Sequence, residues 1–389
     1  MNQKSFLLTL IAVAVLSVSC QQKSWVDQSI DTAGYQLTML ADEIADSAKL
    51  PRSIRNGAIR LEDLYDWTSG FFPGSLWYMY EFTGDESFKS KAQQFTNLLY
   101  NLKDYRGTHD LGFMVYCSYG NGFRLTGDTS YVPVMVQTAD NLISRFHPVS
   151  GTIRSWDFGK WQYPVIIDNM MNLELLFWAS EHTGDPKYKE VAVRHADITM
   201  QQHYRSDFSS YHVIDYDTIT GGVRSKGTFQ GYADESAWAR GQAWGLYGYI
   251  VCYRFTQDEK YLDFARNIAS FIMKSVDTND RIPYWDYNAP NIPDAPRDAS
   301  AAAITASALF ELSTFVEDGV SYFSYAETIL KNLSGEAYLA KKGENKGFVL
   351  MHSVGHLPAN SEIDTPLNYA DYYYLEALKR YKELAIAAN

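Results

Sequence analysis

Two aspartates stand where a carboxyl group could transfer a proton. Asp168 interrupts the apolar segment Val165-Ile-Ile-Asp-Asn-Met-Met-Asn172, and Asp110 stands in Thr108-His-Asp-Leu-Gly-Phe113. A carboxylate in apolar surroundings is costly unless it is paired or used. Asp168 is therefore interpreted either as a catalytic carboxyl group or as the N-cap of a helix, and Asp110 is a second candidate for a functional carboxyl group.

A second group of candidates lies between Tyr211 and Trp244, a segment rich in polar and aromatic side chains. Arg240 has no acidic residue three or four positions away, so its guanidinium group could bind the carboxylate of a ligand. The alternative is an internal ion pair with Asp234 or another acid. His212 is a hydrogen-bonded loop histidine unless it lies beside Arg240.

The composition restricts the class of ligand. The chain has 46 acidic and 34 basic residues and a net charge of −12, so it lacks the basic face that nucleic acid binding requires. Aromatic residues make up 15% of the chain. Aromatic rings pack against the apolar faces of sugar rings, so a saccharide cleft would use this excess, but a large helical core would use it as well.

The sequence lacks the motifs of several other classes of enzyme. The sequence has no Gly-x-Ser-x-Gly elbow, no His-Glu-x-x-His motif and no phosphate-binding glycine-rich loop. Cys117 and Cys252 belong to no CxxC motif, and His352 and His356 flank Gly355 in an expected loop. We therefore predict no metal site and no cofactor.

The N-terminus resembles a bacterial lipoprotein leader. Lys4 precedes an apolar run from Phe6 to Val18, which is too short to cross a bilayer, and small residues precede Cys20. We expect a signal peptide at 1–19, lipidation of Cys20, a tether at 20–26 and a periplasmic protein that meets the membrane only through this anchor.

A short polar turn recurs along the rest of the chain. It reads Thr-Gly-Asp at 83–85, 126–128 and 183–185, and Thr-Gln-Asp at 256–258. An aromatic-rich apolar segment precedes each turn, and an amphipathic segment follows it. Since Gly can end one helix and Asp can cap the next, each turn predicts a helical hairpin.

Two further segment pairs complete an all-α domain at 27–389. One pair is 299–315 with 322–333, and the other joins 369–384 to an N-terminal helix over 27–49. Twelve helices in six hairpins predict an (α/α)6 barrel with apolar inner helices and amphipathic outer helices. The long connectors should then meet at one end and build the site, while Cys117 and Cys252 should lie too far apart for a disulfide.

Five ordered motifs lie between residues 67 and 378. They are Trp67-Thr-Ser-Gly-Phe-Phe-Pro-Gly-Ser-Leu-Trp77, His109-Asp-Leu-Gly-Phe113, Ile166-Ile-Asp-Asn-Met-Met-Asn172, Gln230-Gly-Tyr-Ala-Asp-Glu-Ser-Ala-Trp-Ala-Arg-Gly-Gln-Ala-Trp244 and Tyr369-Ala-Asp-Tyr-Tyr-Tyr-Leu-Glu-Ala-Leu378. Together they resemble the motifs of unsaturated glucuronyl hydrolases of glycoside hydrolase family 88. One departure is Phe229, which stands where many members have His.

The resemblance implies a barrel enzyme that removes a Δ4,5-unsaturated glucuronic acid from lyase-generated glycosaminoglycan oligosaccharides by hydrating the vinyl ether. It implies that Asp168 is the general acid/base and Asp110 the second essential aspartate. It also implies that substrate contacts come from the positions Trp67, His212, Gln230, Trp238, Arg240 and Trp244. A raised pKa of Asp168 would let one carboxyl group serve both proton transfers.

Two alternatives stay open at this point. One is an unsaturated rhamnogalacturonyl hydrolase of the same fold that acts on pectin fragments. The other is a lipoprotein that binds sugar without cutting it, although the presence of both Asp110 and Asp168 argues against it.

Overall fold

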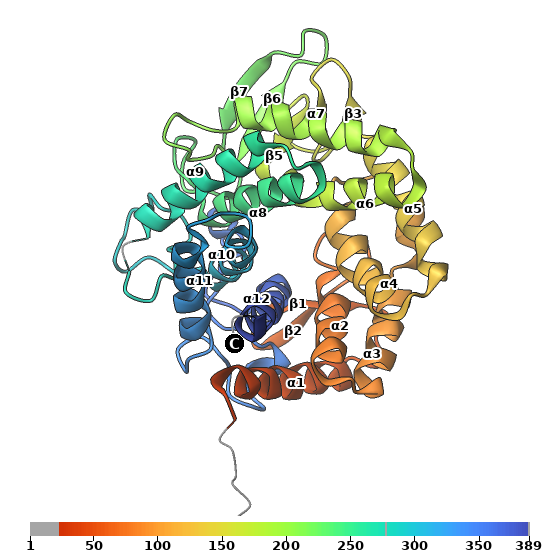
Figure 1. Cartoon of the computed structure of the whole chain (residues 1–389), viewed down its shortest axis with the longest axis vertical. Helices are drawn as coiled ribbons and strands as arrows, with labels where there is room; N and C mark the ends of the chain where they lie inside the picture. The colour runs from red at the N-terminus through yellow and green to blue at the C-terminus, as the bar shows by residue number, and fades with distance from the viewer. Residues whose placement is uncertain (1–22, 277, 388–389) are drawn as a thin grey trace, which may run out of the picture.

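The computed structural model describes residues 23–276 and 278–387 of the 389-residue chain. Helices dominate this part of the chain, so the predicted helical class is confirmed at that level (Figure 1). The leader at 1–19 and Cys20 lie outside the described residues, and the predicted lipid anchor stays a prediction. Among the described helices, none has the length and apolar character needed to cross a membrane.

The described residues form five of the expected hairpins from consecutive helices, and the sixth pair joins α12 to α1 from the two ends of the chain. The inner members are α2 (Phe71–Thr83), η2 with α4 (Gly112–Gly120 and Asn121–Thr126), η4 with α6 (Ile167–Asn172 and Leu173–Thr183), α8 (Ala239–Thr256), α10 (Ala299–Leu312) and α12 (Asn368–Ala387). The outer members are α3 (Glu86–Asn97), α5 (Val132–Ile143), α7 (Pro186–Gln202), α9 (Glu259–Ser275), α11 (Gly319–Leu333) and α1 (Trp25–Glu43).

The recurring turns work as the sequence predicts. Gly84 ends α2 with a φ of 66°, in the left-handed region that glycine adopts without steric cost, and Asp85 caps α3 by accepting a hydrogen bond from the Ser87 amide. Asp185 and Asp258 cap α7 and α9 in the same way. Each turn therefore ends an inner helix and starts an outer one.

The inner helices contact one another in a closed ring. α2 contacts η2, η2 contacts α6, α6 contacts α8, α8 contacts α10, α10 contacts α12, and α12 returns to α2. In Figure 1 the outer helices surround this ring. The hairpin turns lie at the C-terminal ends of the inner helices, so the long connectors lead to the N-terminal ends.

Burial separates the two sets of helices. In α8 every residue from Ala239 to Tyr253 is buried, whereas α9 buries one face, including Tyr261, Ala265 and Ile272. An inner helix has neighbours on both sides and must be apolar almost all round, while an outer helix keeps one polar face in water. The predicted difference between the two sets is confirmed.

Some sequence predictions about elements were wrong. The helix expected over 27–49 spans Trp25–Glu43, and turn residues then lead to a strand that begins at Leu50. The all-α description also misses short antiparallel strands in the connectors. These are β1 (Leu50–Arg55) with β2 (Ala58–Glu62), β3 (Phe146–His147) with β4 (Thr152–Ile153), and a sheet of β5 (Pro164–Ile166), β6 (Val213–Tyr216) and β7 (Val223–Gly227) in that order. Cys117 and Cys252 are both free, as expected.

Gly74 lies where α2 passes its two neighbours in the ring. A Cβ atom there would lie 2.5 Å from the Tyr372 ring of α12 and 2.6 Å from the Cys117 carbonyl oxygen of η2. Such distances lie well inside van der Waals contact, so α2 can approach both helices only without a side chain at this position.

We therefore expect Gly74→Ala to lower the free energy of unfolding by about 1–3 kcal/mol, the usual effect of overpacking a core. Denaturant unfolding followed by circular dichroism measures this. Gly222→Ala is the matched control, because the nearest atom to a Cβ there is the Thr220 hydroxyl at 3.4 Å. Equal stability of the two variants would contradict close packing at Gly74.

Candidate active site

A pocket of about 390 Å³ lies at the N-terminal ends of the inner helices, where the connectors meet. Of the residues predicted from sequence, Trp67, Asp110, Asp168 and Gln230 line it directly. The expectation that the connectors build the site therefore agrees with the position of this pocket. Its other walls come from Arg52, Tyr65, Asp66, Tyr105, Gly107, Thr108, His109, Trp156, Phe158, Ile166, Phe229, Gly355, His356 and Tyr369.

Asp168 lies in the first turn of η4 and lines this pocket. Its side chain is 8% exposed, and it makes no helix-capping hydrogen bond. Burial raises the pKa of Asp168 to about 7, although His109 and Arg240 act against that shift and Asp110 adds to it. A carboxyl group with this pKa can hold a proton near neutral pH and can also release it.

Asp110 is held in the opposite protonation state. Its Oδ1 lies 3.1 Å from His109 Nε2, and its Oδ2 accepts a hydrogen bond of 2.6 Å from the Thr108 hydroxyl. Burial raises the pKa of Asp110, but His109 and Thr108 outweigh this effect, so the pKa lies below its ordinary value. The pocket thus holds one ionised carboxylate beside one carboxyl group that tends to stay neutral.

His212 lies next to Asp168, with its Nε2 atom 3.6 Å from Asp168 Oδ2. The backbone amides of Phe229 and Gln230 donate hydrogen bonds to His212 Nδ1 at 3.0 and 3.1 Å. A nitrogen that accepts two hydrogen bonds carries no proton, so the proton of the neutral ring lies on Nε2 and faces Asp168. Burial and the nearby Arg240 hold the pKa of His212 well below its ordinary value, which keeps the ring neutral.

Arg240 is deeply buried at the start of α8, only 1% exposed. Its Nη1 atom lies 3.3 Å from Asp298 Oδ2, so the internal ion pair does form, but its acid is Asp298 and not Asp234. The guanidinium group lies 4.4 Å from the centre of the Trp238 ring, and the Trp238 ring contacts His212 at a centroid distance of 4.7 Å. Trp238, Arg240 and His212 therefore form one packed group behind the pocket wall.

An aromatic floor closes the inner end of the pocket, and we define it as Phe71, Phe113, Trp244, Tyr369 and Tyr373. Trp244 is fully buried and packs against Phe113 and Tyr373 at centroid distances of 5.0 and 5.3 Å. Tyr369 continues this packing to Trp67 at 4.9 Å. Among these floor residues Tyr369 lines the pocket, whereas Trp244 lies behind its wall.

Several buried polar atoms of these residues have no hydrogen-bond partner within the described part of the chain. They are Asp168 Oδ2, His212 Nε2, Arg240 Nε, Trp244 Nε1 and the Tyr369 hydroxyl group. Buried polar groups in proteins are nearly always paired. Unpaired atoms on four of the predicted site residues mark the position where a polar ligand can supply hydrogen bonds.

The outer end of the pocket has an aromatic rim, formed by Trp156, Phe158, Phe229 and His356. Trp156 and Phe158 stack at a centroid distance of 5.1 Å, and Phe229 lies 5.5 Å from Trp156 and 4.7 Å from His356. Phe158 is 57% exposed, which is unusual for so large an apolar side chain. This rim is an apolar surface on which a sugar ring can pack.

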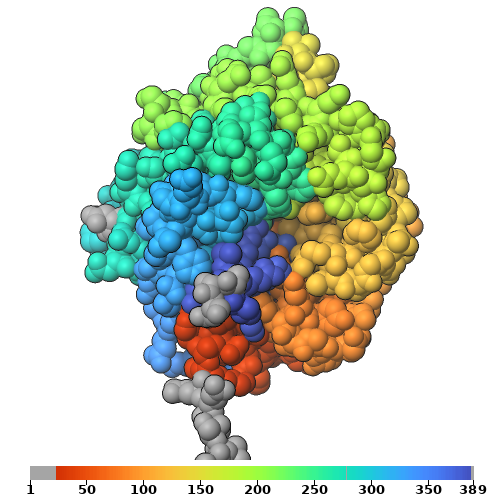
Figure 2. Space-filling view, viewed as in Figure 1, coloured from red at the N-terminus to blue at the C-terminus, as the bar shows by residue number. Residues whose placement is uncertain are grey.

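A larger cavity of about 500 Å³ lies at the other end of the ring, among the C-terminal halves of the inner helices. Figure 2 views the molecule from this end, where the surface is hollowed beside α12. Phe113 and Tyr373 of the aromatic floor line this cavity, whereas none of the predicted site residues does. The floor therefore separates the two cavities.

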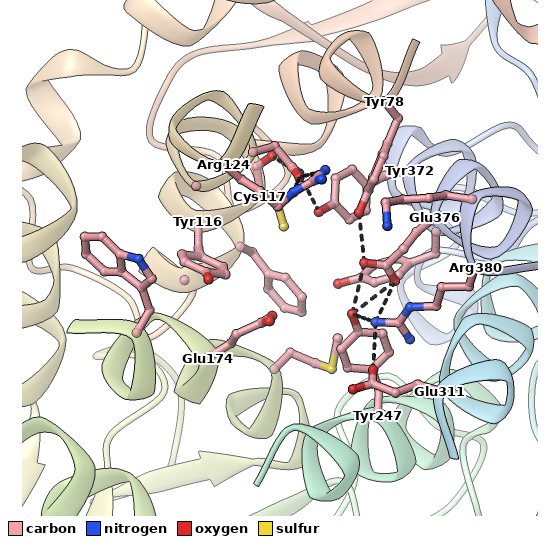
Figure 3. A pocket seen from close by; sticks show the side chains of 18 of the residues that line it. Tyr78, Tyr116, Cys117, Arg124, Glu174, Tyr247, Glu311, Tyr372, Glu376 and Arg380 are labelled. Carbon is pink, nitrogen blue, oxygen red and sulfur yellow. Dashed lines mark hydrogen bonds and ion pairs between the residues drawn. The ribbon is translucent and has the colours of Figure 1, made fainter. Parts of the chain in front are cut away.

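The charged groups of this second cavity pair with one another. Glu376 accepts hydrogen bonds from the Tyr78 and Tyr247 hydroxyl groups at 2.9 and 3.0 Å, and Arg380 bridges Glu376 and Glu311 (Figure 3). Arg254 joins Glu311 to Glu174. A network in which the carboxylates already have partners stabilises the ring, so the smaller pocket, with its unpaired atoms, is the candidate active site.

Sequence reasoning missed several residues of the pocket. His109 immediately precedes Asp110, and Tyr369 stands in a quoted motif, so their positions carried a signal that was not used. Asp298 carried no such signal, because it reaches the site only through its tertiary contact with Arg240. His352 and His356 bind Asp364 and the Phe229 carbonyl group, and no described group of three or more His, Cys, Asp or Glu side chains could hold a metal ion.

Comparison with known proteins identifies the family. The sequence model of glycosyl hydrolase family 88 matches residues 41–379. The chain belongs to this family. A second model, described only as a domain of unknown function, matches residues 1–61. Membership makes the chain a glycosidase.

Similar proteins include other family 88 enzymes. An unsaturated glucuronyl hydrolase of Formosa agariphila is 51% identical over 325 residues, which cover 82% of this chain and 81% of the relative. An unsaturated chondroitin disaccharide hydrolase of Streptococcus agalactiae is 33% identical and covers 92% of this chain and 91% of its own. The crystal structure of an unsaturated glucuronyl hydrolase specific for heparin, 54% identical, superposes with a TM-score of 0.90 over 93% of this chain and 98% of that one.

The buried carboxyl group of Asp168 should make the stability of the folded chain depend on pH. Its pKa is about 7 in the folded chain and about 3.9 when unfolded. Between these values the folded state binds more protons, so its stability falls as the pH rises, and the full penalty is reached above about pH 7. Asparagine cannot ionise, so the variant Asp168→Asn avoids this penalty. Its free energy of unfolding should be higher than that of the wild type by on the order of 2–4 kcal/mol at about pH 8, and the difference should be much smaller at about pH 4.5.

Thermal and denaturant unfolding at both pH values measure this difference. The control is Asp128→Asn, because Asp128 is an exposed helix cap whose pKa lies below its ordinary value through hydrogen bonds to Ser130. A stability difference between Asp168→Asn and the wild type that does not change with pH would show that Asp168 ionises normally.

Proposed function

We propose that this family 88 member is an unsaturated glucuronyl hydrolase that acts on lyase-generated glycosaminoglycan oligosaccharides, with Asp168 as its general acid/base. The observation that carries the proposal is the Asp168 carboxyl group, buried in the wall of the pocket with a pKa of about 7 beside the ionised Asp110. The relatives named as unsaturated glucuronyl and chondroitin disaccharide hydrolases support the substrate class.

The reaction begins with proton transfer from Asp168 to carbon 4 of the unsaturated uronic acid. The double-bond electrons form the new C–H bond, and positive charge develops at carbon 5, shared with the ring oxygen. Water then adds to carbon 5 and gives its proton to the Asp168 carboxylate, which restores the acid. The resulting hemiketal opens, and the glycosidic bond breaks.

The neighbouring side chains fit these steps. Asp110 stays ionised, and its negative charge raises the pKa of Asp168 and stabilises the developing positive charge. His212 presents its Nε2–H group beside Asp168, and Arg240 supplies a fixed cation near the site for the uronate carboxylate. Because no displacement occurs at the anomeric carbon, the carboxylate separation that distinguishes retaining from inverting glycosidases has no bearing here.

Sugar contacts follow from the aromatic residues of the pocket. Trp67 and Gln230 line the inner part, where the uronic acid is placed, and the aromatic rim faces the next sugar. Phe229 gives this rim an apolar surface. We also classify the closed ring of inner helices as an (α/α)6 barrel, which the ring contacts and the similar solved structures support.

The test is turnover of unsaturated disaccharides from chondroitin, hyaluronan and heparin, and separately of unsaturated pectin fragments, followed by loss of the ultraviolet absorbance of the double bond. We expect loss with the glycosaminoglycan set. Asp168→Asn should reduce kcat by at least about 10²–10⁴-fold, the usual contribution of general acid/base catalysis, while binding persists. Asp128→Asn serves as the control that retains activity.

The other outcomes separate the alternatives. Turnover of pectin fragments alone would favour an unsaturated rhamnogalacturonyl hydrolase. Binding of the disaccharides without loss of absorbance would favour a protein that recognises sugar without cutting it. Substantial turnover by Asp168→Asn would assign the acid/base role to another residue.

The pH dependence of kcat is a separate prediction. Asp168 must be protonated at the start of the reaction, and its pKa is about 7. The rate should therefore be highest at mildly acidic pH and should fall about tenfold for each pH unit well above the pKa. Steady-state kinetics across the pH range measures this profile, and a rate that still rises above about pH 8 would contradict it.

A further inference from the structure

Asp298 connects three parts of the molecule behind the active site. It is fully buried and caps α10, where its Oδ1 atom accepts hydrogen bonds from the Ser300 amide and hydroxyl groups at 3.0 and 2.6 Å. The same oxygen accepts a hydrogen bond from the Val354 amide at 3.3 Å. Its other oxygen faces Arg240 Nη1.

Arg240 is fixed on every side by this arrangement. Nη1 also donates to the Val354 carbonyl group, and Nη2 donates to the Gly355 carbonyl group at 2.7 Å. The guanidinium group lies between the rings of Trp238 and Tyr369, at 4.4 and 5.2 Å. Nε has no partner among the described residues, and Nη2 has one printed acceptor for its two N–H groups, so the N–H donors left for a ligand lie on Nε and Nη2.

The carbonyl groups that bind Arg240 belong to a loop that covers the pocket, and we call residues 352–365 the capping loop. Gly355 and His356 of this loop line the pocket. The loop contains four non-glycine residues with positive φ: His352, Asn360, Glu362 and Asp364. Such conformations disfavour L-residues, so the loop needs contacts that hold it in place.

The far side of the capping loop has its own anchor. Glu362 pairs with Arg52 at 2.8 Å and with Arg60 at 3.0 Å, and both arginines come from the β1–β2 hairpin. On the side nearest the catalytic carboxyl group, the contacts come from Arg240, from Asp298 and from Gln230, whose side chain donates to Gly355 at 3.3 Å. The Asp298–Arg240 pair is therefore the charged attachment of the loop on the catalytic side.

We propose that Asp298 is a positioning residue, which orients Arg240 toward the substrate and, through the same ion pair, holds the capping loop over the pocket. The inference rests on the proposed role of Arg240 in binding the uronate. A carboxylate is needed because a buried guanidinium group without a counter-ion would turn toward other acceptors or admit water. Asp298 does not contact the substrate and acts only through Arg240 and Val354.

A purely structural role as a helix cap is the competing explanation. Asp85 and Asp128 also cap helices through their side chains, and neither has a salt bridge among the described residues, so capping alone does not require an ion pair. Asp298→Asn keeps an oxygen that can cap α10 and accept from Val354, and it removes only the charge that pairs with Arg240. Asp258→Asn, the same change in the cap of an outer helix, is the matched control.

The first experiment needs no turnover. Hydrogen–deuterium exchange on the full chain should show faster exchange in peptides that cover 352–356 for Asp298→Asn and for Arg240→Gln, with α10 and the Arg52-anchored part near Glu362 less affected. Asp258→Asn should leave exchange in 352–356 unchanged. Unchanged exchange in this segment for both site variants would overturn the loop part of the proposal, whether or not the chain hydrolyses unsaturated disaccharides.

The second experiment is a double-mutant cycle in the absorbance assay, once the wild type has shown turnover. Asp298→Asn should lower kcat/KM by roughly tenfold or more, mainly through KM. In an Arg240→Gln background the same change should cost little further, because Asp298 acts through Arg240. An equal loss in both backgrounds would mean that Asp298 is only a cap.

If Asp298→Asn does not fold, a second variant still tests the proposal. The double variant Asp298→Asn/Arg240→Gln removes both charges of the buried pair, which proteins tolerate better than the loss of one. If it folds, it should show the fast loop exchange of Arg240→Gln and the same kcat/KM. Loop exchange in the double variant as slow as in the wild type would overturn the proposal.

Discussion

The burial of one carboxyl group governs the organisation of the candidate active site. Asp168 lines a pocket whose walls are largely aromatic, so water cannot stabilise its charge, and its pKa rises to about 7. The protonation state of each neighbouring polar group is then fixed by its own contacts. His109 keeps Asp110 ionised, two backbone amides keep His212 in one tautomer, and Asp298 balances Arg240. These polar groups all come from the connectors and the first turns of the inner helices.

The ring of helices makes this arrangement possible. Each inner helix presents its N-terminal end to the pocket, and the hairpin turns keep all six ends at one side of the molecule. The opposite end holds a paired network of glutamates and arginines, which satisfies its own charges. Polar groups at one end are thus free to serve a ligand, while those at the other end join the helices.

The sequence predicted the helical framework closely because its signals are local. Thr-Gly-Asp turns and apolar periodicity depend on neighbouring residues, so the hairpin boundaries could be placed within a few residues. The strand pairs in the connectors were missed, because strands such as β5 and β6 pair across some fifty intervening residues and carry only short apolar runs.

The site was predictable only in part, for the same reason. Asp110 and Asp168 were identified as residues, but the raised pKa of Asp168 depends on burial that only the folded chain creates. The partner of Arg240 was expected to be Asp234 or another acid, and Asp298 lies 58 positions away along the chain. Likewise, the contribution of Gly355 and His356 depends on how the capping loop folds back over the pocket.

The aromatic floor determines which part of a saccharide chain can enter the pocket. Phe113, Trp244 and Tyr373 pack across the axis of the ring, so the catalytic pocket has an entrance and no exit on the far side. A long chain cannot thread through such a blind pocket or be cut in its middle. Only a terminal residue can reach Asp168, the released sugar must leave by the way it entered, and each product has to diffuse out before the next chain end can bind. Under the proposed reaction, such a pocket removes a single unsaturated residue from each chain end, because the residue exposed next has no double bond to protonate.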